Sequence, residues 1–287
     1  MRWLRRCGPA AERRALELAA TLPAVFGIAA VTVLVAQSLI GADHCLLHHH
    51  HAHLCLLHGS PWLGRSWAVT LVTGAAVLGC ARYTMLAVTM VRRRRSIARL
   101  RAASSRVDGI WWIDSPHAVC FVAGLRRPEI YVSTGTWDAL DDDERAAMLA
   151  HERAHVRHGD IGRRILIDVC SSLAAPLAAR LRCLWDSATE RLCDARAAAD
   201  VGSSESVASA MVKVSRLGVQ ARISPAGFTP QASALADRVD AVLSDPPTGD
   251  RAARVLLTSV ACAALGVIVM AAFHAQALHN AIEQLFG

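Results

Sequence analysis

The sequence predicts a multi-pass α-helical membrane protein with a cytoplasmic α+β domain, and two observations support this fold class. The first is a set of long segments without charged residues, and the second is an uneven distribution of arginine along the chain. Of the 287 residues, 53% are hydrophobic and 19% are charged. This composition excludes a disordered chain, a collagen-like chain and a small disulfide-bonded scaffold.

Three segments are long and apolar enough to be membrane-spanning helices. Leu18–Ala42 and Val255–Phe273 contain no charged residue, and Ser66–Val91 contains only Arg82. A helix needs about 20 apolar residues to cross the hydrocarbon core of a bilayer. We therefore predict two spans before the central part of the chain and one after it. Ile165–Ala179 is apolar but contains an aspartate and a proline, and we expect it to form a helix that packs on the membrane face or dips into it.

The arginines predict the topology of these spans. They cluster before the first span and after the second, where Arg92–Arg95 stand in a row, whereas the intervening segment Asp43–Arg65 contains one arginine. Basic residues remain on the cytoplasmic side of a membrane, so the N-terminus and residues 92–254 are predicted to be cytoplasmic. The predicted parts are an N-terminal membrane region (1–91), a cytoplasmic domain (92–250) and a C-terminal span with a short external tail (251–287).

The same arginines bear on two classes of partner, lipids and nucleic acids. They are expected to attract the anionic lipids of a bilayer. Direct nucleic-acid binding is not expected, because the arginine cluster lacks interleaved aromatic residues.

The cytoplasmic domain begins with strand-like segments and continues with helical ones. Residues 109–114, 118–122 and 129–133 are β-branched or aromatic and are separated by Ser-Pro and Arg-Pro turns, so they predict three short strands. A helix is predicted to begin after Asp141, which can form a capping box with Glu144, and to end at Gly159. Further helices are predicted at about 186–200, 204–218 and 231–243.

An HExxH motif, formed by residues 151–155, lies within the helix that follows Asp141. Residues i and i+4 share one helix face, so the imidazoles of His151 and His155 can bind the same metal ion. Glu152 lies about 100° around the helix from His151, where its carboxylate can take a proton from a water activated by the metal. We interpret the two histidines as zinc ligands and Glu152 as the catalytic base. The alternative is a solvated His–Glu face of the helix.

A catalytic zinc ion usually has three protein ligands and an open position, so a third ligand is expected. Glu190 is the leading candidate, because Glu190 and Asp194 are spaced i, i+4 on a predicted helix. Asp194 would then orient a ligand histidine through the ring N–H. The alternative role for Glu190 is a capping box with Ser187. Other candidates for the third ligand are Asp160, His158, Glu144 and Cys193.

The ordered series of motifs resembles the membrane gluzincin metallopeptidases. It comprises residues 115–124 (SPHAVCFVAG), 128–135 (PEIYVSTG), 149–160 (LAHERAHVRHGD) and the Glu190/Asp194 pair. One branch of this group is peptidase family M56, the BlaR/MecR-type antirepressor proteases. The other is the related family M48, which includes HtpX and the CAAX prenyl proteases. We favour M56, because the interval from His155 to Glu190 is short and two predicted spans precede the domain.

The resemblance implies a gluzincin-type zinc metallopeptidase domain acting on a cytoplasmic protein, such as a transcriptional repressor. It implies that His151, His155 and Glu190 bind zinc, that Glu152 is the base, and that Asp194 supports a ligand. It also implies that the strand around Ile130–Ser133 binds substrate by β-augmentation. Helix 235–243 matches no motif and receives no role. Only residues 274–287 follow the last predicted span, so we expect no C-terminal β-lactam sensor.

The predicted external loop 43–58 is rich in histidine and contains Cys45 and Cys55. Imidazole and thiolate are good ligands for zinc and copper, which suggests an external metal site. The two cysteines could instead form a disulfide, or the loop could be a polar, low-complexity interfacial segment. Metal titration of a peptide covering residues 43–59 tests these alternatives.

Two other functions are consistent with the sequence. One is a quality-control protease of membrane proteins, by resemblance to HtpX. The other is a catalytically silent, metal-sensing receptor built on the same fold. The intact His151, Glu152 and His155 set argues against a silent protein, which has no need of the base.

Overall fold

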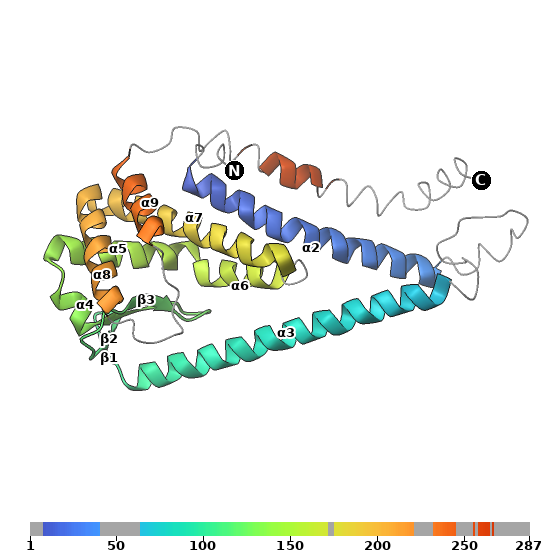
Figure 1. Cartoon of the computed structure of the whole chain (residues 1–287), viewed down its shortest axis with the longest axis horizontal. Coiled ribbons are helices and arrows are strands. Elements are labelled where there is room, and N and C mark those ends of the chain that lie inside the picture. Colours follow the sequence, from blue (N-terminus) through green and yellow to red (C-terminus); the bar gives the residue numbers. More distant parts are fainter. Residues whose placement is uncertain are drawn as a thin grey trace, which may run out of the picture.

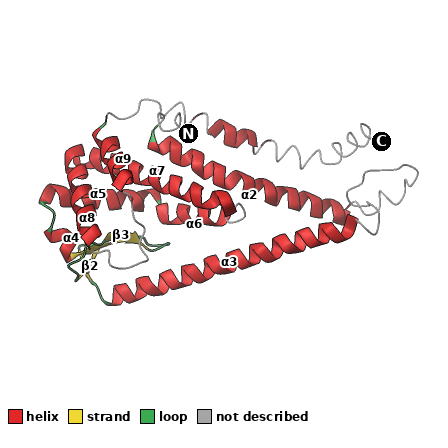
Figure 2. Ribbon diagram, in the orientation of Figure 1, coloured by secondary structure: helices red, strands yellow, loops and turns green. Residues whose placement is uncertain are grey.

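The computed structural model describes residues 8–40, 64–171, 175–220 and 232–244, together with 255, 258–264 and 266. The predicted external loop 43–58 and most of the predicted span 255–273 lie outside these residues. The part predicted to be cytoplasmic combines a small sheet with packed helices, as expected for an α+β domain (Figure 2).

The sheet has four strands in the order β1-β2-β4-β3. β2 pairs with β4 in parallel, and β3 pairs with β4 antiparallel. β4 is therefore central, whereas β3 is paired on one side only among the described strands. All three predicted strands are present, and β1 was not predicted. The strands are β1 (Ser105–Val107), β2 (Ile110–Ile113), β3 (Cys120–Ala123) and β4 (Glu129–Ser133).

Local sequence signals explain where the HExxH helix begins and ends. α5 (Asp142–His158) starts with the predicted capping box, in which Asp141 accepts from the Glu144 amide and Glu144 accepts from the Asp141 amide. It ends at Gly159, whose φ of 64° is left-handed. Upstream, the Ser133 hydroxyl caps α4 (Thr134–Asp138) directly after β4. The N-caps Ser133 and Asp141 thus fix where α4 and α5 begin in the segment that leads from the sheet to the HExxH helix.

Four further helices complete the domain. They are α6 (Asp160–Ser171), α7 (Ala175–Val201), α8 (Ser204–Gln220) and α9 (Ala232–Leu243). The prediction of one helix over 165–179 is wrong, because this segment is divided between α6 and α7. The aspartate noted in the sequence, Asp168, lies in α6, and the proline, Pro176, lies in the first turn of α7.

The main hydrophobic core lies between the sheet and the helices α5, α7, α8 and α9. Val132 of β4, Leu149 of α5 and Val207 of α8 are among its buried members. A second, smaller cluster joins α2 (Pro9–Ile40) to α6 and α7, where Leu16 packs with Ile167 and Trp185. The HExxH helix is therefore held by both the sheet and the other helices.

Two long helices extend from the domain (Figure 1). α2 packs against α6 and α7 near its N-terminal end. α3 (Gly64–Ala102) leads directly to the sheet, so the predicted boundary between residues 91 and 92 falls inside one continuous helix. Among the described residues, no helix combines the length and apolarity needed to cross a bilayer.

Candidate metal centre and active site

The two histidines of HExxH point their Nε2 atoms at one place. His151 and His155 lie on the same face of α5, and their Nε2 atoms are 3.1 Å apart. Glu190 of α7 faces them: Oε2 lies 3.6 Å from the Nε2 of His151, and Oε1 lies 3.6 Å from the Nε2 of His155. The structure thus brings together the three predicted ligands.

The spacing of these atoms fits zinc. Bonds of about 2.1 Å in a tetrahedral arrangement place two ligand atoms about 3.4 Å apart. The two Nε2 atoms are 3.1 Å apart, and each lies 3.6 Å from a different oxygen of the Glu190 carboxylate, so the separations are close to that value. A histidine–histidine–glutamate set also leaves the fourth position open, as in catalytic zinc sites.

Both histidines are oriented by a carboxylate on the other ring nitrogen. The Nδ1 of His151 lies 2.9 Å from Oδ1 of Asp194, and the Nδ1 of His155 lies 2.8 Å from Oδ2 of Asp160. An Nδ1–H that donates to a carboxylate leaves the Nε2 lone pair free for a metal. Asp194 therefore contacts His151 as the sequence suggested, and Asp160 serves His155 in the same manner.

Two arginines hold these carboxylates in turn. Arg238 of α9 donates to both oxygens of Asp194 at 2.8 Å and lies 3.1 Å from Glu190. Arg13 of α2 donates to Asp160 at 2.7 Å. Sequence reasoning missed both. It gave helix 235–243 no role and attributed Arg13 to membrane topology, and no local pattern links either arginine to HExxH.

The surroundings of the His151 imidazole favour a positive charge. Burial lowers the pKa of His151, but hydrogen bonds with Asp194 and Glu190 outweigh burial and raise that pKa to about 10. Burial raises the pKa of Glu190, yet His151 and Arg238 hold it below its ordinary value. The pKa of Asp194 is also lowered, because Arg238 and His151 overcome the effect of burial. Such a cluster of fixed anions suits a divalent cation as well as a proton.

A model of the family described as BlaR1 peptidase M56 matches residues 61–242. This match covers more than half of the chain and includes HExxH, Glu190 and Asp194. The chain belongs to the peptidase M56 family. The M56 match begins after α2, so Arg13 contributes to the site from outside the matched segment.

The M56 chain also resembles a protein of the related family M48. It is 32% identical over 105 residues to a protease HtpX homolog of Nitrosomonas europaea, and this covers 35% of the chain and 34% of that protein. The chain thus spans about a third of the relative's length. No solved structure matches.

The M56 domain places the other candidate ligands away from the two Nε2 atoms or in other roles. Cys193 lies 3.4 Å from the Nδ1 of His155, on the opposite side of the ring. Burial and the nearby carboxylates raise the pKa of its thiol far above the ordinary value, so it is a poor ligand. Glu144 is bonded to Lys213 and Ser209 at the start of α5.

Two further alternatives are not supported: a capping box for Glu190 and His158 as the third ligand. Ser187 lies inside α7, twelve residues beyond its start at Ala175, so a capping box with Glu190 is wrong. His158 is the last residue of α5 and does not join the ligand group that the described residues form.

A cleft of about 650 Å³ opens at the metal centre of the M56 domain. His151, Glu152 and Glu190 line it together with Phe121 and Val122 of the edge strand β3. Burial and then the Glu152 carboxylate raise the pKa of the Cys120 thiol, because Glu152 lies beside this strand. The predicted base, the predicted ligands and an edge of β3 that is unpaired among the described strands therefore share one cavity.

The expected role of the strand at Ile130–Ser133 in β-augmentation is wrong. These residues belong to β4, which is hydrogen-bonded to β2 on one side and to β3 on the other. A paired strand has no free backbone groups for a peptide. The strand that faces the cleft with an unpaired side is β3, which the local sequence pattern could not reveal because it does not contain the strand order.

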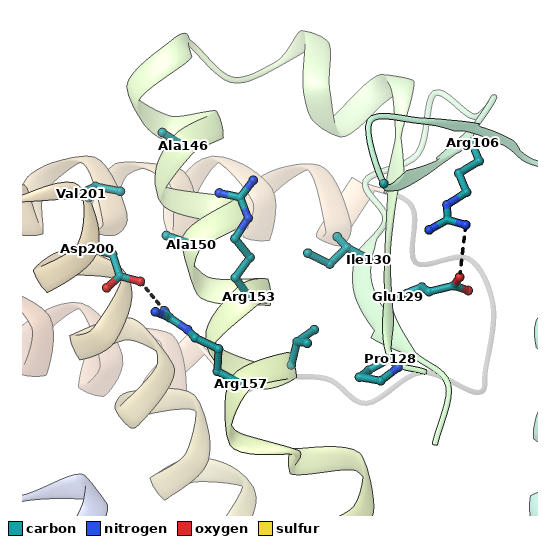
Figure 3. Close-up of a pocket in the computed structure, with 12 residues that line it drawn as sticks. Arg106, Pro128, Glu129, Ile130, Ala146, Ala150, Arg153, Arg157, Asp200 and Val201 are labelled. Carbon is teal, nitrogen blue, oxygen red and sulfur yellow. Dashed lines mark hydrogen bonds and ion pairs between the residues drawn. The ribbon is translucent and has the colours of Figure 1, made fainter. Parts of the chain in front are cut away.

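A second cavity of about 480 Å³ lies between α5, the sheet and the end of α7, and His151 and His155 are not among the residues that line it (Figure 3). Arg153 of the HExxH motif and Arg157 one turn later face it, and Arg157 is paired with Asp200 of α7. Ala154, the other variable residue of the motif, is fully buried. The HExxH helix thus separates the catalytic cleft from this rear cavity.

Proposed function

We propose that the chain is a membrane-attached zinc endopeptidase. In this proposal His151, His155 and Glu190 bind zinc, and Glu152 is the catalytic base. The observation that carries the proposal is the convergence of both Nε2 atoms and the Glu190 carboxylate in one cleft. The same cleft contains Glu152 and an edge of β3 that is unpaired among the described strands. Membership of the M56 family supports the peptidase activity.

In this proposal, different residues of the cleft bind the substrate, hold the metal and transfer the proton. β3 pairs with an extended substrate through its free backbone groups and holds the scissile bond over the metal centre. Bound zinc would polarise the substrate carbonyl and lower the pKa of a water toward about 7. The Glu152 carboxylate takes the proton of the attacking water and passes it to the leaving amine. Asp194 and Asp160 keep the imidazoles in one tautomer throughout.

Glu152→Gln tests this mechanism. The variant should retain zinc at the wild-type content, because Glu152 is not a ligand, and should lose peptide cleavage. Glu190→Ala should lower the zinc content measured by elemental analysis. Cleavage that survives in Glu152→Gln contradicts the assigned base, and unchanged zinc in Glu190→Ala contradicts the assigned third ligand.

Attachment to a bilayer is supported by the surface of α2 and α3. Large apolar side chains are exposed along both helices, and such surface is usually covered by lipid or a partner. These residues are Val25, Phe26 and Ile28 in α2, and Val77, Leu78, Tyr83, Met85, Val88 and Val91 in α3. The chain should remain with membranes after an alkaline carbonate wash. Its release into the supernatant contradicts the proposal.

The substrate in this proposal is a cytoplasmic protein, such as a transcriptional repressor. The similarity to a protease HtpX homolog favours a second candidate, turnover of membrane proteins. Comparison of the proteomes of cells with wild-type chain and Glu152→Gln distinguishes them. The first candidate predicts accumulation of one cytoplasmic DNA-binding protein in the variant, and the second predicts accumulation of several membrane proteins.

A further inference from the structure

One wall of the catalytic cleft is formed by α3, and this wall carries two arginines. Met90, Arg93, Arg94 and Ile97 line the same cavity as His151. Their spacing of i, i+3, i+4 and i+7 places them on one face of the helix. Met90 and Ile97 are partly buried, whereas Arg93 and Arg94 are exposed to solvent.

The acidic side chains of the cleft do not neutralise these two arginines. Apart from the base Glu152, each acid that lines the cleft is paired with a different arginine. The pairs are Asp160 with Arg13, Asp186 with Arg164, and Glu190 with Arg238. Within the described part of the chain, neither Arg93 nor Arg94 has a hydrogen bond or an ion pair. Two positive charges in the cleft are thus available to an anionic group from outside.

An extended peptide on β3 would bring side chains to this wall. Phe121 and Val122 of β3 line the same cleft as Arg93 and Arg94 of α3. The side chains of a strand alternate between its two faces, so a peptide paired with β3 directs some of its side chains across the cleft. Carboxylates are the peptide groups that a guanidinium binds most strongly.

We propose that Arg93 and Arg94 select peptide substrates that carry an acidic side chain close to the scissile bond. The inference rests on the proposed peptidase function and adds its substrate class. It also divides the Arg92–Arg95 cluster, which the sequence analysis assigned as a whole to membrane topology. Arg92 and Arg95 belong to the same run but do not line the cleft, so they provide a matched control.

The test uses the full chain in neutral detergent with zinc. A mixed peptide library, read by mass spectrometry, gives the residues that surround the cleaved bonds. A preferred sequence is then made as a Glu and a Gln peptide, and kcat/KM is compared for both. The wild type should favour Glu by about threefold to tenfold, as expected for partly exposed ion pairs. R93Q/R94Q should lose this preference and R92Q/R95Q should keep it.

Two results overturn the inference: no preference for acidic peptides in the wild type, or an unchanged preference in R93Q/R94Q. High salt should weaken the wild-type preference, because solvent ions screen exposed charges. Binding of the fluorescent Glu and Gln peptides to an E152Q chain separates this inference from the proposed function. Selective binding that depends on Arg93 and Arg94 supports the acidic site even if the wild type cleaves neither peptide, in which case the peptidase proposal fails.

Discussion

Arg13 donates a hydrogen bond of 2.7 Å to Asp160, although the two residues are 147 positions apart in the sequence. Both side chains are buried. The other carboxylate oxygen of Asp160 contacts the Nδ1 of His155, so the first turns of α2 are connected to the metal-binding face of α5. The N-terminal helix is in this sense a structural part of the proposed active site.

We predict that Arg13→Gln lowers the free energy of unfolding by about 3 kcal/mol, because it leaves the buried carboxylate of Asp160 without its cation. The double variant with Asp160→Asn should lose much less than the sum of the two single changes, which a chemical denaturation series on all four proteins measures. Arg163→Gln is the control. Arg163 also joins α6 to Glu17 of α2, but it is exposed, so its loss should cost less than about 1 kcal/mol. Equal costs for Arg13 and Arg163 would contradict the assigned importance of the buried pair.

Asp194→Asn should reduce zinc affinity by roughly tenfold to a hundredfold. An asparagine can present its NH2 group to the Nδ1 of His151, which favours the tautomer with a protonated Nε2 and removes the lone pair that the metal needs. Asparagine also cannot accept both hydrogen bonds from Arg238. Competition with a fluorescent chelator gives the affinity.

The control for this change is Asp200→Asn at the end of the same helix. Asp200 is partly exposed and pairs with Arg157 of the rear cavity, so its loss should leave zinc affinity unchanged. A similar decrease in both variants would show that general charge, and not orientation of His151, controls zinc binding.

The sequence predicted the parts of the site that depend on local spacing. His151 and His155, the pair Glu190 and Asp194, and the caps of α5 all lie within one or two turns of a helix, where periodicity fixes which side chains are neighbours. To predict that α5 and α7 lie side by side, it was enough to assume that His151, His155 and Glu190 bind one metal ion. For that reason the three candidate ligands could be named before the structure was known.

The parts that were missed depend on tertiary contacts. Arg238 is 44 residues from Asp194, and nothing in helix 235–243 distinguishes it from a surface arginine. Strand order is equally invisible in a local pattern, so β4 was chosen as the substrate strand although it is central. The arginines of α3 follow an apolar segment, which suggested only a role in membrane topology. The proposed role of Arg93 and Arg94 in substrate selection depends on the cleft, which only the structure reveals.

Glu144→Gln should reduce stability at neutral pH and remove part of its dependence on acid. Burial raises the pKa of Glu144, but bonds from Lys213, Ser209 and the Asp141 amide outweigh it and lower the pKa from 4.5 to about 2. The stabilisation by Glu144 is therefore complete above pH 4.5 and is lost as the pH falls toward 2. The difference between wild type and variant should decrease over this range.

Denaturation of zinc-chelated protein across this pH range measures the effect without a contribution from zinc release. Asp142→Asn is the matched control, because it removes a carboxylate from the same first turn of α5 but at an exposed position. It should change stability by less than about 1 kcal/mol. A constant difference between wild type and Glu144→Gln from neutral pH to pH 2 would contradict the lowered pKa.

Gly135→Ala should destabilise the domain, although alanine is the better helix former. Gly135 lies in α4, and a Cβ there would stand 2.2 Å from the carbonyl oxygen of Pro116 in the connection between β2 and β3. The backbone cannot retreat without breaking the 2.9 Å hydrogen bond from the Gly135 amide to Ser115. We expect a loss of about 3 kcal/mol, measured by denaturation. Gly162→Ala in α6 is the contrasting control, since its Cβ would meet only a Leu125 methyl at 3.8 Å and should stabilise the helix by up to about 1 kcal/mol. The same sign of the stability change for both variants would contradict close packing at Gly135. Displacement of the connection between β2 and β3 would also shift β3. Gly135→Ala should therefore lower kcat/KM while zinc affinity is retained.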